Sequence, residues 1–108
     1  MDRRPTPDRR AINTEPVLES FEIEAQGLMF TATVSRGVDG TVQEIFLTNH
    51  RAGSDAGINA QDAAVVCSIA LQYGVPLDVI RRALMRDSGG RPSGPLGIAL
   101  DTVARSAP

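Results

Sequence analysis

Reactive side chains are scarce in this sequence, which has one cysteine, one histidine, one tyrosine and no tryptophan among its 108 residues. A single cysteine excludes an intramolecular disulfide and any metal cage built from several cysteines. His50 has no second histidine as a co-ligand, and its nearest acidic neighbour is Asp55, so no metal site is predicted. A nucleophile–base pair of Cys67 and His50 is the least favoured hypothesis, because Cys67 lies in an apolar helical pattern. No catalytic residue is therefore predicted.

Long apolar runs are also missing from the sequence. No stretch is as long as a membrane span, and residues 1–20 have no apolar core of the kind found in signal peptides. The net charge of −2 gives no general attraction to nucleic acids or to anionic lipids. We therefore expect a soluble, cytoplasmic protein without a membrane partner.

The N-terminal residues differ in composition from the rest of the chain. They combine arginines with prolines and have few apolar side chains; the residues concerned are Arg3, Arg4, Pro5, Pro7, Arg9 and Arg10. Such a stretch buries too little apolar surface to fold, so residues 1–19 are predicted to form a disordered basic tail. Residues 20–105 are predicted to form one small domain, in a chain that is 42% hydrophobic.

Three segments in the first half of the chain alternate apolar and polar residues, as strands with one buried face do. They are residues 21–24, 28–35 and 42–48. The hairpin between the last two contains Asp39-Gly40, a pair that tolerates the positive φ angles of tight turns. Short turns between consecutive strands predict a three-stranded antiparallel meander.

The second half of the chain changes to helical spacing. Asn59 is the predicted N-cap of a first helix, which ends before Gly74. Its expected buried positions are Ala63, Val66, Cys67, Ala70 and Leu71. Pro76 is predicted to open a second helix, and Ser93 or Gly94 a third. Strands followed by helices predict an α+β fold with three helices packed on one face of the sheet.

The turn after the third strand is the main candidate binding site. Small residues let a ligand approach the backbone, an arginine can clamp a phosphate or carboxylate, and a nearby helix start attracts anions. The candidate residues are Asn49, Arg51, Ala52, Gly53 and Ser54. The alternative is a turn that only links a strand to a helix, where glycine and serine are ordinary. The segment is not a Walker loop, because it lacks the Gly-Lys-Ser/Thr ending.

Residues 60–86 also fit a helix-turn-helix, which gives a second hypothesis, a small DNA-binding regulator. Ala70 allows two helices to cross closely, and Gly74 allows the tight turn between them. The phosphate contacts of such a protein would come from Arg81, Arg82 and Arg86. The same pattern describes any compact helix–glycine–helix corner, and Pro76 and Asp78 are poorly suited to reading bases. DNA therefore ranks below a protein or a small anion as the partner.

Several motifs, in this order, resemble the TSCPD domain. That domain occurs near the C-terminus of adenosylcobalamin-dependent (class II) ribonucleotide reductases and as short stand-alone proteins. The motifs are Asp39-Gly40, Glu44-Ile45-Phe46, Arg51-Ala52-Gly53-Ser54 and Gly74-Val75-Pro76-Leu77. At the Thr-Ser-Cys-Pro-Asp signature of the family, this chain has Pro92-Ser93-Gly94-Pro95-Leu96 and lacks the cysteine. A thiol redox or metal role is therefore not carried over, and only a helix-start site at Ser93 and Gly94 remains.

The resemblance implies an association with ribonucleotide reduction rather than the reaction itself. A ribonucleoside-diphosphate reductase needs a large barrel and several redox cysteines, which a chain of 108 residues with one cysteine does not hold. It implies a non-catalytic accessory or stand-alone module that binds a class II reductase or a nucleotide, with adenosylcobalamin confined to the full-length enzyme. Because a three-stranded sheet has two free edges, a homodimer through an edge or through the helices is a further expectation.

Overall fold

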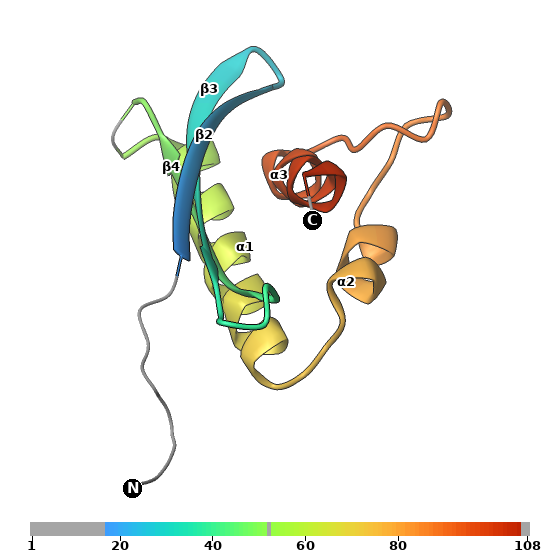
Figure 1. The fold of residues 1–108 in the computed structure, drawn as a ribbon. Helices are drawn as coiled ribbons and strands as arrows, with labels where there is room; N and C mark the ends of the chain where they lie inside the picture. Colours follow the sequence, from blue (N-terminus) through green and yellow to red (C-terminus); the bar gives the residue numbers. More distant parts are fainter. Residues whose placement is uncertain (1–16, 52, 107–108) are drawn as a thin grey trace, which may run out of the picture.

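A computed structural model describes residues 17–51 and 53–106 of the chain (Figure 1). In this part of the chain three strands precede three helices, which confirms the predicted α+β fold. The strands are β2 (Val17–Ala25), β3 (Leu28–Arg36) and β4 (Val42–Asn49). The helices are α1 (Asp55–Gln72), α2 (Leu77–Ala83) and α3 (Pro95–Arg105).

The strands form an antiparallel sheet in the order β2-β3-β4, which is the predicted meander. The register places Ile23 opposite Phe30 and Phe30 opposite Asn49, so alternate residues of the three strands share one face. β2 begins at Val17, earlier than the expected start at Phe21, and residues 17–19 therefore belong to the strand. The rest of the predicted tail, residues 1–16, lies outside the described residues.

All three helices lie on the same side of the sheet (Figure 1). α1 packs along β4, α3 packs against β2, and α2 lies against α3. The core between these layers is apolar, and its largest fully buried side chains are Phe30, Ile45, Leu47, Leu100, Val34 and Val103. None of the described helices covers the opposite face of the sheet, which is mainly polar, as the alternation of the strands predicted.

α1 begins at Asp55, so the prediction that Asn59 caps this helix was wrong. The N-cap is Ser54, whose side chain accepts a hydrogen bond from the Gly57 amide at 3.0 Å. The hydroxyl of Ser54 also donates to the Asn49 side chain at 3.1 Å, which ties the cap to the end of β4. The hydrogen bond from Ser54 to Asn49, at the end of the preceding strand, thus selects the earlier of two suitable caps.

The small residues of α1 face the core, and all of its larger apolar residues except Leu71 face outward. Its buried positions are Gly57, Ala60, Ala64, Cys67 and Ser68. By contrast, the exposed fraction is 48% for Ile58, 66% for Val66 and 87% for Tyr73. The prediction that Val66 is buried was therefore wrong. The reason is that α1 is apolar on both faces, so helical spacing does not indicate which face meets the sheet.

The small inward face brings α1 close enough to bond to the edge of the sheet. β4 is an edge strand, and its Ile45 N–H donates to Ser68 Oγ at 2.9 Å. The Ser68 hydroxyl donates in turn to the Ile45 carbonyl at 3.0 Å. These two bonds satisfy backbone groups that an edge strand otherwise leaves open to another chain. α1 therefore closes the β4 edge at Ile45.

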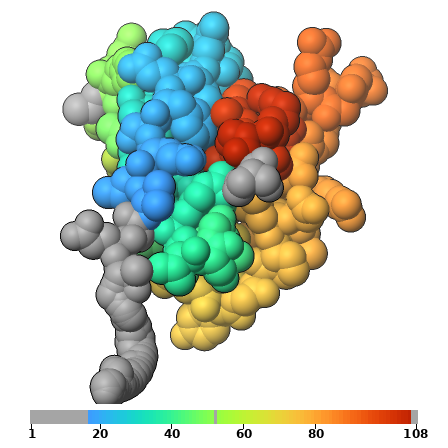
Figure 2. Space-filling model, in the orientation of Figure 1, coloured from blue at the N-terminus to red at the C-terminus, as the bar shows by residue number. Residues whose placement is uncertain are grey.

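The other two helices begin close to the predicted positions. Pro76 is the N-cap of α2 rather than its first residue, and Gly94 is the N-cap of α3 with Pro95 in the first turn. Figure 2 shows α3 (red) between the sheet (blue to green) and the segment of residues 84–94 (orange), which we call the 84–94 arm. Within residues 17–51 and 53–106, no helix combines the length and the apolar character needed to cross a membrane.

Replacing Ser68 by alanine should lower the free energy of unfolding by about 1–3 kcal/mol, because it leaves the buried N–H and C=O of Ile45 unpaired. Urea denaturation followed by circular dichroism measures the loss. The control is Ser20→Ala, whose exposed hydroxyl meets that of Thr33 at 3.1 Å and whose loss should change stability by less than about 0.5 kcal/mol. Equal stability of the two variants would contradict the role given to Ser68.

Candidate functional site

The turn after β4, the main candidate site, is organised around the Asn49 side chain. Asn49 is buried, and its Nδ2 donates to the Met29 carbonyl at 3.2 Å. Its Oδ1 accepts hydrogen bonds from the Arg51 amide at 2.9 Å and from the Ser54 hydroxyl at 3.1 Å. Ser54 then caps α1 through the Gly57 amide. These donors and acceptors are therefore used within the protein.

Little space and few donors remain at this turn for a ligand. The hollow beside it measures about 150 Å³ and is lined in part by Arg51, Gly53 and Gln61. Gly57 also lines the hollow and is packed tightly, since a Cβ there would lie 3.0 Å from both Asn49 Cβ and Ser54 Oγ. Gly53 has a φ of 75°, which other residues rarely adopt. Ala52 lies outside the described residues, and anion binding by this turn stays a prediction.

The single histidine and the single cysteine lie on opposite sides of the sheet. His50 is exposed on the open face, where its Nε2 is 3.1 Å from Thr31 Oγ1 and 3.7 Å from a Glu22 carboxylate oxygen. Cys67 is in the core, and burial raises the pKa of its thiol. A buried, protonated thiol on the far side of the sheet from His50 is not arranged as a nucleophile with a base.

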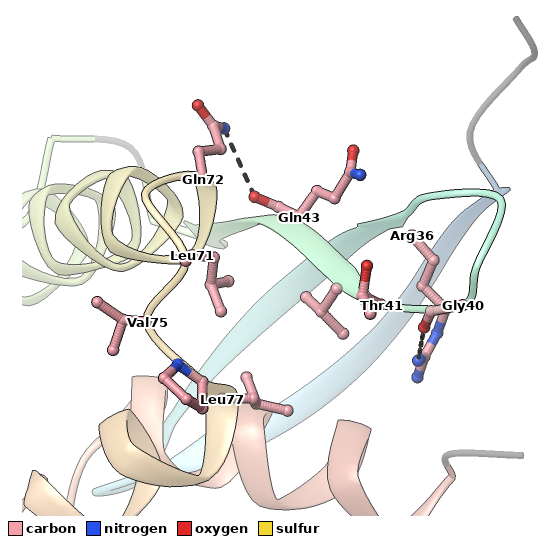
Figure 3. Close-up of a pocket in the computed structure, with 11 residues that line it drawn as sticks. Arg36, Gly40, Thr41, Gln43, Leu71, Gln72, Val75 and Leu77 are labelled. Atoms are coloured by element: carbon pink, nitrogen blue, oxygen red, sulfur yellow. Dashed lines mark hydrogen bonds between the residues drawn. The ribbon is translucent and has the colours of Figure 1, made fainter. Parts of the chain in front are cut away.

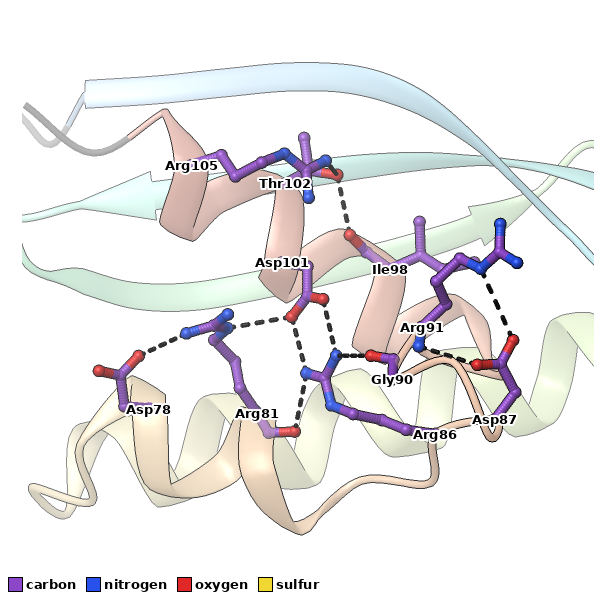
Figure 4. Close-up of polar contacts among 10 residues, drawn as sticks. All are labelled: Asp78, Arg81, Arg86, Asp87, Gly90, Arg91, Ile98, Asp101, Thr102 and Arg105. Carbon is purple, nitrogen blue, oxygen red and sulfur yellow. Dashed lines mark hydrogen bonds and ion pairs between the residues drawn. The ribbon is translucent and has the colours of Figure 1, made fainter.

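Two of the three arginines of the helix-turn-helix hypothesis, Arg81 and Arg86, bind a carboxylate within the protein (Figure 4). Arg86 donates two hydrogen bonds to Asp101 of α3, from Nη1 to Oδ2 at 2.9 Å and from Nη2 to Oδ1 at 2.8 Å. The Nε of Arg81 donates to the same Oδ1 at 3.0 Å, and its Nη1 donates to Asp78 at 2.7 Å. Arg86 also donates to the carbonyls of Arg81 and Gly90, so one guanidinium joins α2, α3 and the 84–94 arm.

This arrangement does not favour DNA recognition. Arg81 and Arg86 point at Asp101, which neutralises charge that phosphate contacts would need, and Arg82 alone of the three is exposed. The pKa of Asp101 is lowered to about 2, mainly by the hydrogen bonds from Arg86 and also by the bond from Arg81. Burial of the carboxylate acts in the opposite direction and raises its pKa. Sequence reasoning missed Asp101, although an acidic residue beside Leu100 in the buried stripe of α3 was a visible signal.

The start of α3 is the last candidate position. The Ser93 amide donates to the Met85 carbonyl at 3.0 Å. The N-cap of α3 is Gly94, so no side chain caps this helix. Gly94 lines an apolar hollow of about 430 Å³ together with Phe30 and Met85. A Cβ at Gly94 would have no atom within 4 Å, so the cysteine of the family signature would fit there.

These features define a class of protein, a small α+β module whose polar groups at each candidate position are largely bonded to one another. Residues 4–105 match the family model described as the TSCPD domain. The chain therefore belongs to the TSCPD domain family, as its motifs predicted. No curated protein and no solved structure matches it.

Ser54→Ala should lower the free energy of unfolding by about 1 kcal/mol, because it removes the acceptor that caps α1. Thermal or urea unfolding measures the change. Ser93→Ala is the matched control, since Ser93 also precedes a helix but its side chain caps nothing. If the two substitutions have the same effect, the Ser54 hydroxyl is not the cap that holds the turn.

Asp101→Asn should destabilise the protein by about 2 kcal/mol at neutral pH, the equivalent of lowering a carboxyl pKa from 3.8 to about 2 on folding. Because the folded-state pKa is the lower one, this stabilisation is complete above pH 3.8 and is lost as the pH falls toward 2. Unfolding titrations of both proteins at several pH values give the difference. Asp78→Asn is the control, because Asp78 is 59% exposed and pairs at the surface. A difference between wild type and Asp101→Asn that does not shrink in acid would contradict the ion-pair origin.

Proposed function

We propose that the protein is a non-catalytic module that works by binding protein through the outward side of α1. The surface consists of Ile58, Val65, Val66, Ile69 and Tyr73, which we call the α1 face. The observation that carries the proposal is the inversion of α1, with small residues in the core and large apolar ones at the surface. Contiguous exposed apolar residues on a small protein are typical of an interaction surface.

The chemistry of the α1 face suits a second copy of the same chain. Residues 63–77 include no charged side chain, and the one charged residue between Ile58 and Val65 is the exposed Asp62. In a twofold pair centred on Val65 and Val66, Asp62 would lie beside the partner subunit's Ile69 and not beside a second acidic residue. In an antiparallel pair about a twofold axis, Val65 would lie beside the partner subunit's Val66, and Ile58 beside the partner subunit's Tyr73. This pairing also sets the helix dipoles in opposite directions. The Ile45 edge of β4 is closed by Ser68, which favours the helical route to a dimer over that edge.

The process in which the module acts is proposed from its family resemblance. TSCPD domains occur in class II ribonucleotide reductases, so we propose that the dimer is an accessory to such an enzyme. In this proposal adenosylcobalamin is held by the reductase and this chain carries no cofactor. The positions of Cys67, in the core, and His50, on the open sheet face, support a role in binding rather than in catalysis.

The test of the α1 face is the oligomeric state of Val66→Glu, measured by sedimentation equilibrium. Wild type should dimerise, and Val66→Glu should raise the dissociation constant at least about tenfold, because it buries two like charges near the axis. Val38→Glu is the matched control, since Val38 is 77% exposed in the β3–β4 turn, away from α1. Mixing Val66→Glu with Val66→Lys should restore a dimer.

Two results would contradict the proposal. One is a wild-type protein that stays monomeric at high concentration, and the other is a dimer that Val66→Glu leaves intact. Retention of the wild type by an immobilised class II reductase in mild salt tests the proposed process separately. The wild type could prove monomeric and still be retained by the reductase. If the reductase then fails to retain Val66→Glu, the α1 face binds the reductase and not a second copy of the chain.

A further inference from the structure

A cavity of about 620 Å³ opens between the β3–β4 turn and the corner that joins α1 to α2 (Figure 3). One wall is apolar and comes from both elements; it comprises Val42, Leu71, Val75, Pro76 and Leu77. The polar lining comes from Arg36, Thr41 and two glutamines, Gln43 and Gln72, and includes no acidic residue. The cavity has the size and the mixed lining of a small-molecule site.

The Arg36 side chain in this lining is the most unusual polar group of the described residues. It is only 9% exposed, and its Nη1 donates to the Gly40 carbonyl at 2.9 Å. Its Nε lies 3.6 Å from a Glu19 oxygen, too far for a strong hydrogen bond. Its Nη2 is buried and has no hydrogen-bond partner in the part of the chain that the structure describes. Buried polar atoms are nearly always paired, so this unused donor points to a ligand.

We propose that the cavity binds a small molecule with one anionic group on an apolar body, either a carboxylate or a phosphate monoester, and that Arg36 pairs with the anion. The apolar wall would contact the body of the ligand. Because Nη2 is itself buried, the guanidinium turns toward the cavity on binding and exchanges the neutral Gly40 carbonyl for a charged acceptor. A charge-assisted bond is roughly twice as strong as a neutral one, and an arginine fork fits both anions.

This site differs from the turn at Arg51 in three respects. Arg51 is exposed, its hollow is about 150 Å³, and the neighbouring hydrogen-bonding groups are engaged by Asn49. Arg36 is buried, has a free donor and lines a cavity about four times larger. Within residues 17–51 and 53–106, the carboxylate that pairs with Arg36 is that of Glu19, which is 43% exposed and does not line the cavity. An incoming anion therefore competes with a weak, partly solvated contact.

The test is a titration of the ¹⁵N-labelled full chain with phenyl phosphate and, separately, with benzoate, followed by amide chemical shifts. We expect saturable shifts at Gly37, Gly40 and Leu77 with at least one anion, whereas benzyl alcohol, which lacks the charge, should bind about tenfold more weakly or not at all. Arg36→Met should weaken anion binding at least about tenfold. Arg51→Met, the matched control, should bind as the wild type does. The two anions distinguish a phosphate site from a carboxylate site.

A second variant keeps the test decisive if Arg36→Met does not fold. Val75→Phe leaves Arg36 in place and fills the cavity from its apolar side, so it should abolish the shifts. The proposal is overturned if neither anion gives saturable shifts at millimolar concentration, or if a folded Arg36→Met binds as tightly as the wild type. Shifts that centre on Gly53 and Ser54 and vanish in Arg51→Met would assign the anion to the other turn.

Discussion

The close approach of α1 to the edge strand β4 is the constraint on which the rest of the fold depends. The fully buried residues of α1 are all small, and they bring Ser68 within hydrogen-bonding distance of both backbone groups of Ile45. The same approach favours glycine at position 57, where a Cβ would lie only 3.0 Å from Asn49 Cβ and from the capping Ser54 Oγ. The larger residues of α1 consequently remain outside, and the α1 face is a direct result of how the helix is seated.

The second half of the domain is held by charge as well as by packing. α2 has no buried residue, and the 84–94 arm extends beyond the helices (Figure 1). Arg81 from α2 and Arg86 from the arm converge on the buried Asp101 of α3. A carboxylate with three charge-assisted hydrogen bonds fixes these elements where little apolar area is available. Arg81 and Arg86, which the sequence suggested as DNA contacts, thus stabilise the fold instead.

The strands and the order of the elements were readable because their signals are local. Alternation marked the sheet face, and the Asp39-Gly40 turn formed with Thr41 bonded to the Asp39 carboxylate and a positive φ at Gly40. The family motifs were likewise local strings, and the match over residues 4–105 confirmed the family. The start of α1 was misplaced because Ser54 and Asn59 are both good caps, and only the contact of Ser54 with Asn49 decides between them.

The sequence by itself determined the α+β class, the meander, the family and the scarcity of reactive groups, because composition, periodicity and turn chemistry act over a few residues. Tertiary structure alone decided which side of the doubly apolar α1 faces the core, and which partners Arg81 and Arg86 take. It also placed Arg36, whose buried Nη2 is unpaired among the described residues, in the lining of a cavity formed by two distant segments. Each of these outcomes depends on contacts between residues far apart in the chain, which no local pattern encodes.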